Sequence, residues 1–423
     1  MRRRVLRISV LLDLAALLVG LEAASLMVFG TAFPWHFRSD VWPMLGGIFV
    51  GGLVGILLAI RTGRNGVPRP SFGRAFVATG AALLASSSLI VFGRTYWSRP
   101  YLATAIGAAF VFMIAHRAIR RRRPWSERMI LVTNEKALAD HIRDAEHVDV
   151  VGFLDPSGIA PEPPEQGITI AVDLRAVLSD DMAQFVSSCS MAGYPMRGLI
   201  QVYEEYTGRL PIVHLLGGWE LTVPLEDRRL YVRVKRAVDT ALVTLTAPLW
   251  LLLGAAIAAA VRVDSKGPVI FSQPRIGLNG KPFTLYKFRT MVGEDDPDRP
   301  KFASHGDERL TRVGRFLRRF RIDEIPQLWN VLRGDLSLVG PRPEQAGFVE
   351  YFSRTIPFYE HRHLVRPGVT GWAQVNYGYA DDEADTIDKL SYDLFYIKHV
   401  SPWLDLEILG QSVWTVLSGF GAR

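Results

Sequence analysis

The sequence almost lacks cysteine: Cys189 is the single cysteine among 423 residues. This excludes an internal disulfide and a metal cluster held by cysteines, and the expected role of Cys189 is that of a small buried apolar side chain. A cleavable signal peptide is also missing, because the first apolar run is too long and lacks a convincing small-residue cleavage site. We therefore expect no disulfide and no removal of the first apolar run.

A glycine-rich turn is missing where a dinucleotide site would need one. From 124 to 230, short β-rich runs alternate with polar helical ones, which predicts a small α/β domain with a parallel sheet. Its first predicted strand, 129–132, is followed by Thr133, Asn134 and Glu135. A working NAD site needs glycines at this turn, so we expect no NAD binding. A structural role and the sensing of a nucleotide or sugar remain open. The expected strands lie in 129–134, 148–155, 168–174 and 196–202.

Apolar residues are abundant, at 49% of the chain, and the mean hydropathy is positive at +0.14. A soluble protein of this size does not need so much apolar surface, so part of the chain is expected in lipid. Four apolar runs are long enough to cross a hydrocarbon layer of about 30 Å. Four spans return the chain to the side on which it started. The runs are 5–33, 41–60, 75–92 and 101–119.

The net charge of +7 favours anionic partners such as lipid headgroups or nucleotides, and we expect no nucleic-acid partner. Many arginines flank the apolar runs, and the positive-inside rule then places both ends of the bundle in the cytoplasm. Within the first run, Asp13 is expected to reach the interface and Glu22 to face other helices. The arginines on the cytoplasmic side are Arg2, Arg3, Arg4, Arg61, Arg64, Arg69, Arg74, Arg117 and 120–123, against Arg38, Arg94 and Arg99 opposite.

A fifth uncharged run covers 241–261. If it crossed the membrane, the basic segment 312–321 would lie outside the cell, which the charge rule opposes. Pro248 lies inside the run and would break or bend a helix there. We therefore expect a re-entrant hairpin over about 237–261, with an ordinary fifth span as the alternative.

Residues 269–291 contain two alternating runs joined by a turn at Asn279-Gly280, which predicts a β-hairpin. Its cations could face a substrate phosphate or solubilise an edge strand. After it, Asp307 is expected to cap an amphipathic, arginine-rich helix that lies at the membrane interface. The hairpin cations are Arg275, Lys287 and Arg289, and the apolar positions of the helix are Leu310, Val313, Leu317 and Phe320.

Two adjacent carboxylates, Asp323 and Glu324, stand at the entrance of a short apolar helix that Gly334 is expected to end. They could be capping residues and nothing more. Clustered arginines precede them, however, and Arg342 follows between Pro341 and Pro343. The two prolines restrict the backbone on both sides of Arg342 and so orient its guanidinium, whose planar set of N–H donors matches the oxygens of a phosphate. This combination favours phosphate chemistry over capping.

Three motifs carry a family resemblance: YKFRTM, DEIPQLWNVLRGDLSLVGPRP and RPGVTGWAQVN. Together they resemble the bacterial sugar transferases that act on polyprenyl phosphate, the monotopic phosphoglycosyl transferases, over 232–423. The apolar first half is similar to that of the long-form members. The resemblance implies an α plus α/β membrane protein in three parts. These are a four-helix transmembrane bundle (1–123), a Rossmann-like cytoplasmic domain (124–230), and a transferase domain (231–423) containing the re-entrant helix, with its bend at Pro248.

The resemblance also implies a reaction. A sugar 1-phosphate passes from a UDP-sugar to undecaprenyl phosphate at the inner leaflet, through a phosphosugar on Asp323 and with release of UMP. Matched to the family's motif, Asp323 is the nucleophile and a ligand of Mg²⁺, Glu324 its metal or proton-handling partner, and Arg318 a phosphate binder. Arg342 is added from its setting between prolines. The hairpin cations Lys287 and Arg289 complete the expected phosphate-binding set.

Further expectations follow from the same resemblance. The protein would be a multi-pass protein of the bacterial inner membrane, with its catalytic domain on the cytoplasmic face of the bilayer. It would initiate exopolysaccharide or O-antigen synthesis, and it would form a homodimer. One alternative is a dehydratase or epimerase on a membrane anchor, which should carry the missing glycine fingerprint. The other is a non-catalytic membrane scaffold of a polysaccharide assembly complex. The identity of the sugar stays open.

Overall fold

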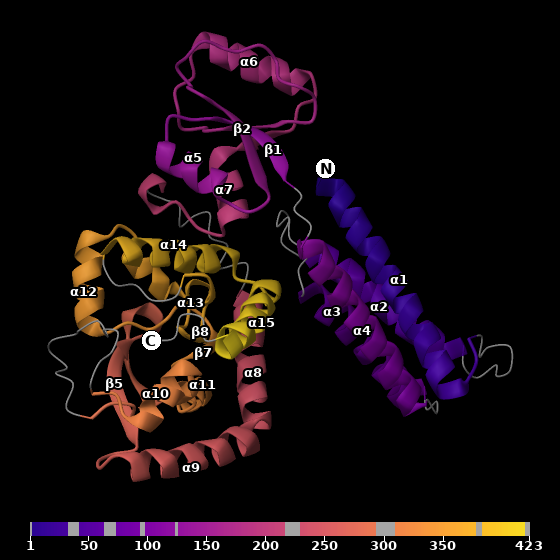
Figure 1. The fold of residues 1–423 in the computed structure, drawn as a ribbon, viewed down its shortest axis with the longest axis vertical. Coiled ribbons are helices and arrows are strands. Elements are labelled where there is room, and N and C mark those ends of the chain that lie inside the picture. The colour runs from indigo at the N-terminus through magenta and orange to yellow at the C-terminus, as the bar shows by residue number, and fades with distance from the viewer. Residues whose placement is uncertain are drawn as a thin grey trace. The chain divides into compact units, whose positions relative to one another are not determined.

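The computed structural model describes most of the chain, and its contacts divide it into two compact units, Met1–Thr207 and Gly208–Arg423 (Figure 1). Each unit is built from its own hydrophobic clusters. The described residues are 2–32, 42–62, 73–93, 98–122, 126–215, 229–292, 309–377 and 383–418.

The first unit begins with four helices, as the apolar runs predict. Helix α1 packs mainly on α4, and α2 on α3. Small residues permit this close approach: a Cβ on Gly20 would come within 2.5 Å of the Ala105 carbonyl oxygen. The helices are α1 (Arg2–Phe29), α2 (Trp42–Thr62), α3 (Gly73–Gly93) and α4 (Arg99–Arg122).

Length and composition make four described helical segments candidates for crossing a membrane. Three belong to this bundle, and the fourth lies in the second unit; the apolar part of α2, Trp42–Leu58, is shorter. The length and apolar composition of these helices therefore identify the chain as a membrane protein. The four segments are Ile8–Phe29, Gly73–Val91, Arg99–Arg120 and Ala247–Asp264.

The expectation that Asp13 reaches the interface is wrong. Its side chain is buried inside the bundle, where Arg117 donates to one carboxylate oxygen at 2.6 Å. The ring Nε2 of His116 lies 2.8 Å from the other oxygen. A buried charge is tolerated when it is paired, and α4 supplies both partners, so the acid has no need to approach water. Glu22 is half-buried.

A four-stranded parallel sheet follows, in the order β2-β1-β3-β4, which confirms the predicted α/β domain. Residues of β1 alternate between two clusters: Met129 and Leu131 pack with α5 and α7, and Val132 packs with α6 and the buried Cys189. The fourth strand is shorter than expected, because the chain turns helical at Leu199. The elements are β1 (Glu127–Val132), α5 (Lys136–Arg143), β2 (Val148–Leu154), β3 (Thr169–Val172), α6 (Asp180–Met191), β4 (Met196–Gly198) and α7 (Leu199–Thr207).

The second unit opens with the short 3₁₀ turn η3 (Ile212–His214) and then two helices, α8 (Arg229–Leu245) and α9 (Ala247–Asp264), which meet at a sharp angle (Figure 1). The predicted hairpin follows as antiparallel β5 (Ile270–Ile276) and β6 (Pro282–Phe288). Its turn, η5 (Leu278–Gly280), has positive φ at both Asn279 and Gly280, which an Asn-Gly pair accommodates.

The predicted helix from Asp307 begins later than expected. Its α-helical part, α10, runs from Arg312 to Arg319, and the Thr311 hydroxyl accepts from the Gly314 amide as its N-cap. Leu310 forms a bridge with Met291 instead of a helical turn, since the chain there pairs with the end of the hairpin. Asp307 lies outside the described residues.

The remaining elements form the main core of this unit. Helix α14 is buried along most of its length, with Leu394, Phe395 and Ile397 nearly inaccessible, and Leu404 and Ile408 of α15 pack on the same cluster. Both helices complete the core of this unit. The elements are η6 (Ile322–Glu324), α11 (Gln327–Arg333), β7 (Ser337–Val339), α12 (Ala346–Thr355), η7 (Tyr359–Leu364), β8 (Gly368–Thr370), α13 (Trp372–Asn376), α14 (Glu383–His399) and α15 (Pro402–Ser418).

Candidate active site

The two carboxylates lie in a 3₁₀ turn directly before α11 and do not cap it. Pro326 occupies the N-cap position, and no side chain makes a capping hydrogen bond there. Gly334 ends the helix in the left-handed conformation, as predicted. Asp323 and Glu324 are only 8% and 7% exposed. Capping therefore does not explain why two acids are buried at this position.

Two cations hold Glu324. The Lys287 ammonium group donates to Glu324 Oε1 at 3.0 Å, and the Arg342 guanidinium donates to the same oxygen at 3.1 Å. Burial opposes ionisation, but the two cations outweigh it and hold the pKa of Glu324 well below its ordinary value. Glu324 is therefore ionised at neutral pH, and it fixes the position of both cations.

Asp323 has the opposite setting. Burial raises its pKa to about 6, against the attraction of Lys287, and the charge of Glu324 adds to the increase. Among the residues that the structure describes, none donates a hydrogen bond to the Asp323 carboxylate. Adjacent acids whose pKa values are pushed apart by their surroundings are typical of sites where the two have different chemical roles.

The turn that carries the pair is strained. Arg321 has a φ of 52°, in the left-handed region that residues other than glycine rarely adopt. Such a conformation costs on the order of 1–3 kcal/mol and tends to occur at functional sites. Here it allows the chain to leave α10 and present the Asp323 and Glu324 side chains within one 3₁₀ turn.

Arg318 approaches from α10. Its Nε donates to the Thr290 hydroxyl at 3.0 Å, and its positive charge lowers the pKa of Asp323 against the larger effect of burial. Helix α10 lies so close to the end of β6 that a Cβ on Gly314 would come within 2.1 Å of the Thr290 carbonyl oxygen. This contact fixes the position of α10 and therefore the position of the Arg318 backbone.

The Arg289 side chain does not contact Asp323 or Glu324. Its guanidinium donates to both the carbonyl and the hydroxyl oxygen of Ser265 at 2.8 Å, where Ser265 is the C-cap of α9. A cation at a helix C-terminus is stabilised by the carbonyl groups there. The structure thus places three of the four predicted phosphate binders around the acids and the fourth at the end of α9.

A buried ion network behind Arg342 could not be predicted from the sequence. Arg362 donates to the Arg342 carbonyl oxygen at 3.0 Å and to Asp393 at 2.8 Å. Glu344 accepts from Lys389 in the same cluster. Burial opposes ionisation of Glu344, but Lys389 and then Arg362 outweigh it and lower its pKa to about 2. The loop that carries Arg342 is therefore anchored by charges from η7 and α14.

The break between α8 and α9 lies at Thr246, so Pro248 is in the first turn of α9. Proline suits that position, because an N–H there would have no helical partner. The Thr246 hydroxyl donates to the Leu242 carbonyl at 2.7 Å, and the Trp250 indole donates to the Val243 carbonyl at 3.0 Å. The bend that the sequence predicts is observed, and the Trp250 side chain supplies a donor to one carbonyl at the break, that of Val243.

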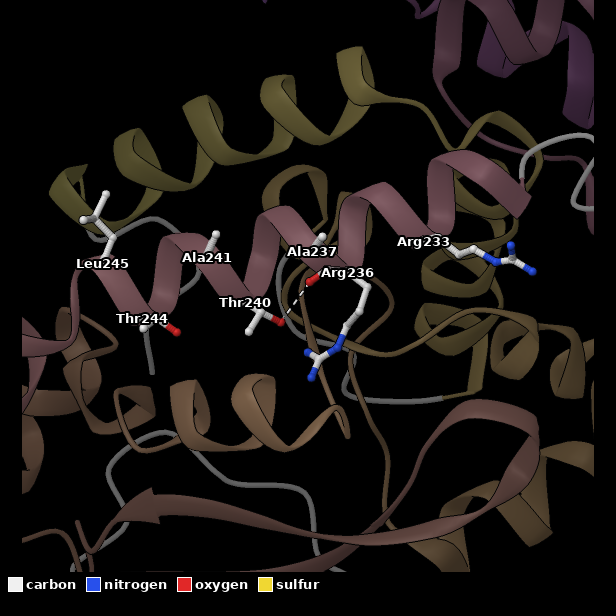
Figure 2. Close-up of a pocket in the computed structure, with 7 residues that line it drawn as sticks. All are labelled: Arg233, Arg236, Ala237, Thr240, Ala241, Thr244 and Leu245. Carbon is white, nitrogen blue, oxygen red and sulfur yellow. Dashed lines mark hydrogen bonds between the residues drawn. The ribbon is translucent and has the colours of Figure 1, made fainter.

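Two of the hollows among the described residues lie in this unit. The larger, of about 670 Å³, runs along α8, and Figure 2 shows that all the residues lining it belong to that helix. Arg236 in its wall donates to the Leu332 carbonyl near the end of α11, whereas the acids precede the start of α11. It is an open helix face, remote from the acids. The smaller, of about 250 Å³, is lined in part by Glu324 itself.

Asp323 and Glu324 place two adjacent carboxylates, which are potential metal ligands, at this site. Among the described residues, no group of three or more histidine, cysteine, aspartate and glutamate side chains could hold a metal ion. Mg²⁺ commonly binds one or two carboxylates together with substrate phosphates, and does not need a cage made only by protein. The uncommitted carboxylate of Asp323 beside Glu324 fits that kind of site.

Comparison with known proteins gives the family. The model of the family described as bacterial sugar transferase matches residues 230–419. A UDP-N-acetylgalactosamine-undecaprenyl-phosphate N-acetylgalactosaminephosphotransferase of Aeromonas hydrophila is 44% identical over 262 residues, 60% of each chain. A UDP-glucose:undecaprenyl-phosphate glucose-1-phosphate transferase of Xanthomonas campestris is 41% identical over 218 residues, half of this chain and 43% of its own.

The chain thus spans 60% and 43% of the length of these two relatives, less than two thirds of each. A third relative, a UDP-glucose:undecaprenyl-phosphate glucose-1-phosphate transferase of Caulobacter vibrioides, is 46% identical over 190 residues, which are 44% of this chain and 69% of the relative. The region matched by the family model contains the acids, their cations and both helices of the bend. On these grounds, the chain belongs to the bacterial sugar transferase family.

Proposed function

We propose that this protein transfers a sugar 1-phosphate from a UDP-sugar to undecaprenyl phosphate. The observation that carries the proposal is the buried pair Asp323 and Glu324, with Lys287, Arg318 and Arg342 around it. The named relatives support it, because each is named as a transferase of a sugar phosphate from a UDP-sugar to undecaprenyl phosphate. The transfer would begin a polysaccharide on its lipid carrier, at the cytoplasmic face of the bacterial inner membrane.

The first step is attack by Asp323. One oxygen of its ionised carboxylate forms a bond to the sugar-linked phosphorus of the UDP-sugar. The bond from that phosphorus to the bridging oxygen breaks, and UMP leaves with the bond's electron pair. An ionised carboxylate needs no base for this attack, and a covalent intermediate divides one difficult step into two easier ones.

The second step restores the enzyme. A phosphate oxygen of undecaprenyl phosphate attacks the same phosphorus, and the bond to Asp323 breaks. The product is a sugar joined to the lipid through a diphosphate, and the carboxylate is free again. The lipid substrate stays in the bilayer, so the site must work at the membrane surface; the bend between α8 and α9 supports this placement.

The cations offset the repulsion between the carboxylate and the phosphates. Lys287 and Arg342 are both held on Glu324, which places two positive charges beside Asp323, where the donor phosphates would lie. Arg318 adds a third positive charge beside Asp323. Groups already positioned where charge develops stabilise a transition state without reorganisation. Glu324 therefore acts by holding these cations as well as by its own charge.

Mg²⁺ is proposed as the metal, with Asp323 and Glu324 as the residues that would hold it. When bound, it would supply positive charge to the phosphate oxygens of the donor. The protein groups that would face the remaining phosphate oxygens are then the three cations Lys287, Arg318 and Arg342. Removal of divalent metal by a chelator should stop UMP release, and added Mg²⁺ should restore it.

The test is Asp323→Asn. The amide is close in size to the carboxylate but is a poor nucleophile, so UMP release and sugar transfer should both fall by at least about 10³-fold, on the scale of a lost covalent route. UMP release from a panel of UDP-sugars, with purified full-length protein and undecaprenyl phosphate, measures this. Asp149→Asn, at an exposed position of β2, is the matched control. Substantial turnover by Asp323→Asn would exclude the covalent route.

A further inference from the structure

Asn330 of α11 is fully buried and joins this helix to β6, the strand that carries Lys287. Its Nδ2 donates to the Thr284 carbonyl oxygen at 2.7 Å, and its Oδ1 accepts from the Tyr286 amide at 3.2 Å. β6 pairs only with β5 among the described strands, so its other edge has no strand beside it. The side-chain amide of Asn330 therefore takes the place of a third strand at this edge.

The orientation of this amide is fixed by its partners. Its Nδ2 also donates to Asp335 Oδ2 at 3.2 Å, so turning the amide over would place Oδ1 against two oxygen atoms. The Asn330 carbonyl oxygen accepts from the Gly334 and Asp335 amides at 3.0 Å each, where α11 ends. Asn330 is thus held through both its side chain and its backbone, and it forms a rigid link between α11 and β6.

The two linked elements carry the two partners of one ion pair of the site. Lys287 lies in β6, and Glu324 lies in the turn that leads into α11. Apolar packing also holds the elements together, because Leu285 and Val331 belong to one cluster. Such packing is not directional, so it does not fix where β6 lies along α11. Hydrogen bonds have strict geometry, and the two that Asn330 makes with β6 set this position.

We propose that Asn330 is a positioning residue for the transfer reaction: by fixing β6 on α11, it holds the Lys287 ammonium group at Glu324 and beside Asp323. The inference rests on the proposed function. A slip of β6 by one residue would move its backbone by about 3.4 Å and turn Lys287 to the opposite face of the strand. The contact of 3.0 Å between Lys287 and Glu324 would then be lost.

The alternative is a purely structural role. A buried asparagine that satisfies backbone groups stabilises the fold, and its loss lowers the fraction of folded protein. The hydrogen bonds of Asn330 reach neither Asp323 nor Glu324, so its effect on the reaction would pass through Lys287. A positioning role therefore predicts that Asn330 and Lys287 depend on each other, whereas a structural role predicts independent effects.

The test is a double-mutant cycle between Asn330→Leu and Lys287→Met. Leucine is close in size to asparagine but makes no hydrogen bond to β6. The kcat/KM for the UDP-sugar is measured by UMP release with the full-length protein. With Asn330 present, Lys287→Met should lower kcat/KM by about 10²-fold, the scale of removing one preorganised donor. In Asn330→Leu the same substitution should lower it by less than about tenfold, because Lys287 is already displaced.

Each fold-change compares two proteins that share one background, so a smaller folded fraction caused by that background cancels. Val331→Ala is the matched control, since Val331 is adjacent to Asn330 and equally buried, and its side chain makes only apolar contacts with β6. In Val331→Ala, Lys287→Met should keep its effect of about 10²-fold. An undiminished effect of Lys287→Met in Asn330→Leu would overturn the inference. An equal reduction in Val331→Ala would do so too, because general loosening would then explain it.

A measurement on the wild-type protein guards against misfolding of Asn330→Leu. Hydrogen exchange at the Tyr286 amide, followed by mass spectrometry in the full-length protein, should be slow because Asn330 accepts from this amide. Fast exchange, as expected of an unpaired strand edge, would overturn the inference. UMP release by a protein in which Asn330 and Lys287 act independently defeats the positioning role alone. Slow exchange in a protein that releases UMP from no UDP-sugar defeats the proposed reaction and leaves the link between β6 and α11 intact.

Discussion

Asp323 and Glu324 are adjacent, equally buried and chemically alike, yet their surroundings give them different ionisation. Lys287 and Arg342 both contact Glu324, whereas no described residue donates a hydrogen bond to Asp323. Glu324 accepts hydrogen bonds from both cations directly. Asp323 is attracted by the same cations only electrostatically, at longer range. Glu324 thereby organises the cations, and Asp323 keeps the uncommitted carboxylate that the proposed reaction requires.

The raised pKa of Asp323 predicts a pH dependence. Only the ionised carboxylate can attack phosphorus, so kcat/KM for the UDP-sugar should fall about tenfold per pH unit once the pH is below the pKa of Asp323, which burial raises. The measurement is UMP release against pH at low donor concentration. Lys287→Met removes the largest charge that lowers this pKa, so the acid limb should move to higher pH. An acid limb that Lys287→Met leaves in place would assign the titration to another group.

The raised pKa of Asp323 also predicts that this carboxyl group lowers the free energy of unfolding. Asp323 titrates at about 6 in the folded protein against 3.8 for an unperturbed side chain, so its charged form opposes folding. The resulting loss of folding stability is greatest above about pH 6, decreases as the pH falls, and disappears below about pH 4. Asp323→Asn should therefore raise stability near pH 8 by up to about 3 kcal/mol while abolishing transfer. Thermal unfolding in detergent at two pH values measures it, and a lower melting temperature near pH 8 would contradict the expectation.

At the scale of elements, the site depends on one close approach between α10 and the residues that follow β6. Gly314 lies on the Thr290 backbone, and the hydroxyl of Thr290 accepts from Arg318. Nothing with a side chain fits at this contact. The glycine therefore sets both the packing of α10 and the position of the arginine beside Asp323.

Gly314→Ala should consequently damage stability and activity together. The added Cβ would meet the Thr290 carbonyl oxygen at 2.1 Å, so α10 must shift, at a cost of about 1–3 kcal/mol. Transfer should fall because Arg318 moves with the helix. Gly410→Ala in α15, where a Cβ meets nothing within 4 Å, is the control and should leave both unchanged or slightly improve stability. Equal melting temperatures for the two variants would show that the contact is not tight.

At the scale of the whole molecule, the break between α8 and α9 bears on the side of the membrane where the C-terminus lies. A hairpin that enters and leaves one leaflet keeps all later residues in the cytoplasm, and the arginine-rich α10 agrees with that side. A fluorescent reporter that folds only in the cytoplasm, fused after Arg423, should therefore be bright. Alkaline phosphatase fused there, which needs the periplasm, should be inactive. The opposite pair of results would mean that Ala247–Asp264 crosses the bilayer.

The sequence by itself determined most of the elements and pointed to the acidic pair Asp323 and Glu324. Apolar length fixed the four helices of the bundle, Asn279-Gly280 fixed the hairpin turn, and Pro248 marked the bend to within two residues. These features are local, because helix length, turn conformation and helix breaking depend on neighbours along the chain. Motif order likewise indicated the family, which the comparisons confirm.

Only the tertiary structure decided which charges meet. It placed Lys287 and Arg342 on Glu324, sent Arg289 to the end of α9, and buried Asp13 against α4. The network of Arg362 and the hydrogen bonds from Asn330 to β6 were equally invisible beforehand. The physical reason is that ion pairs and buried hydrogen bonds join residues far apart in the sequence, and their energies depend on distance and burial that no local pattern encodes.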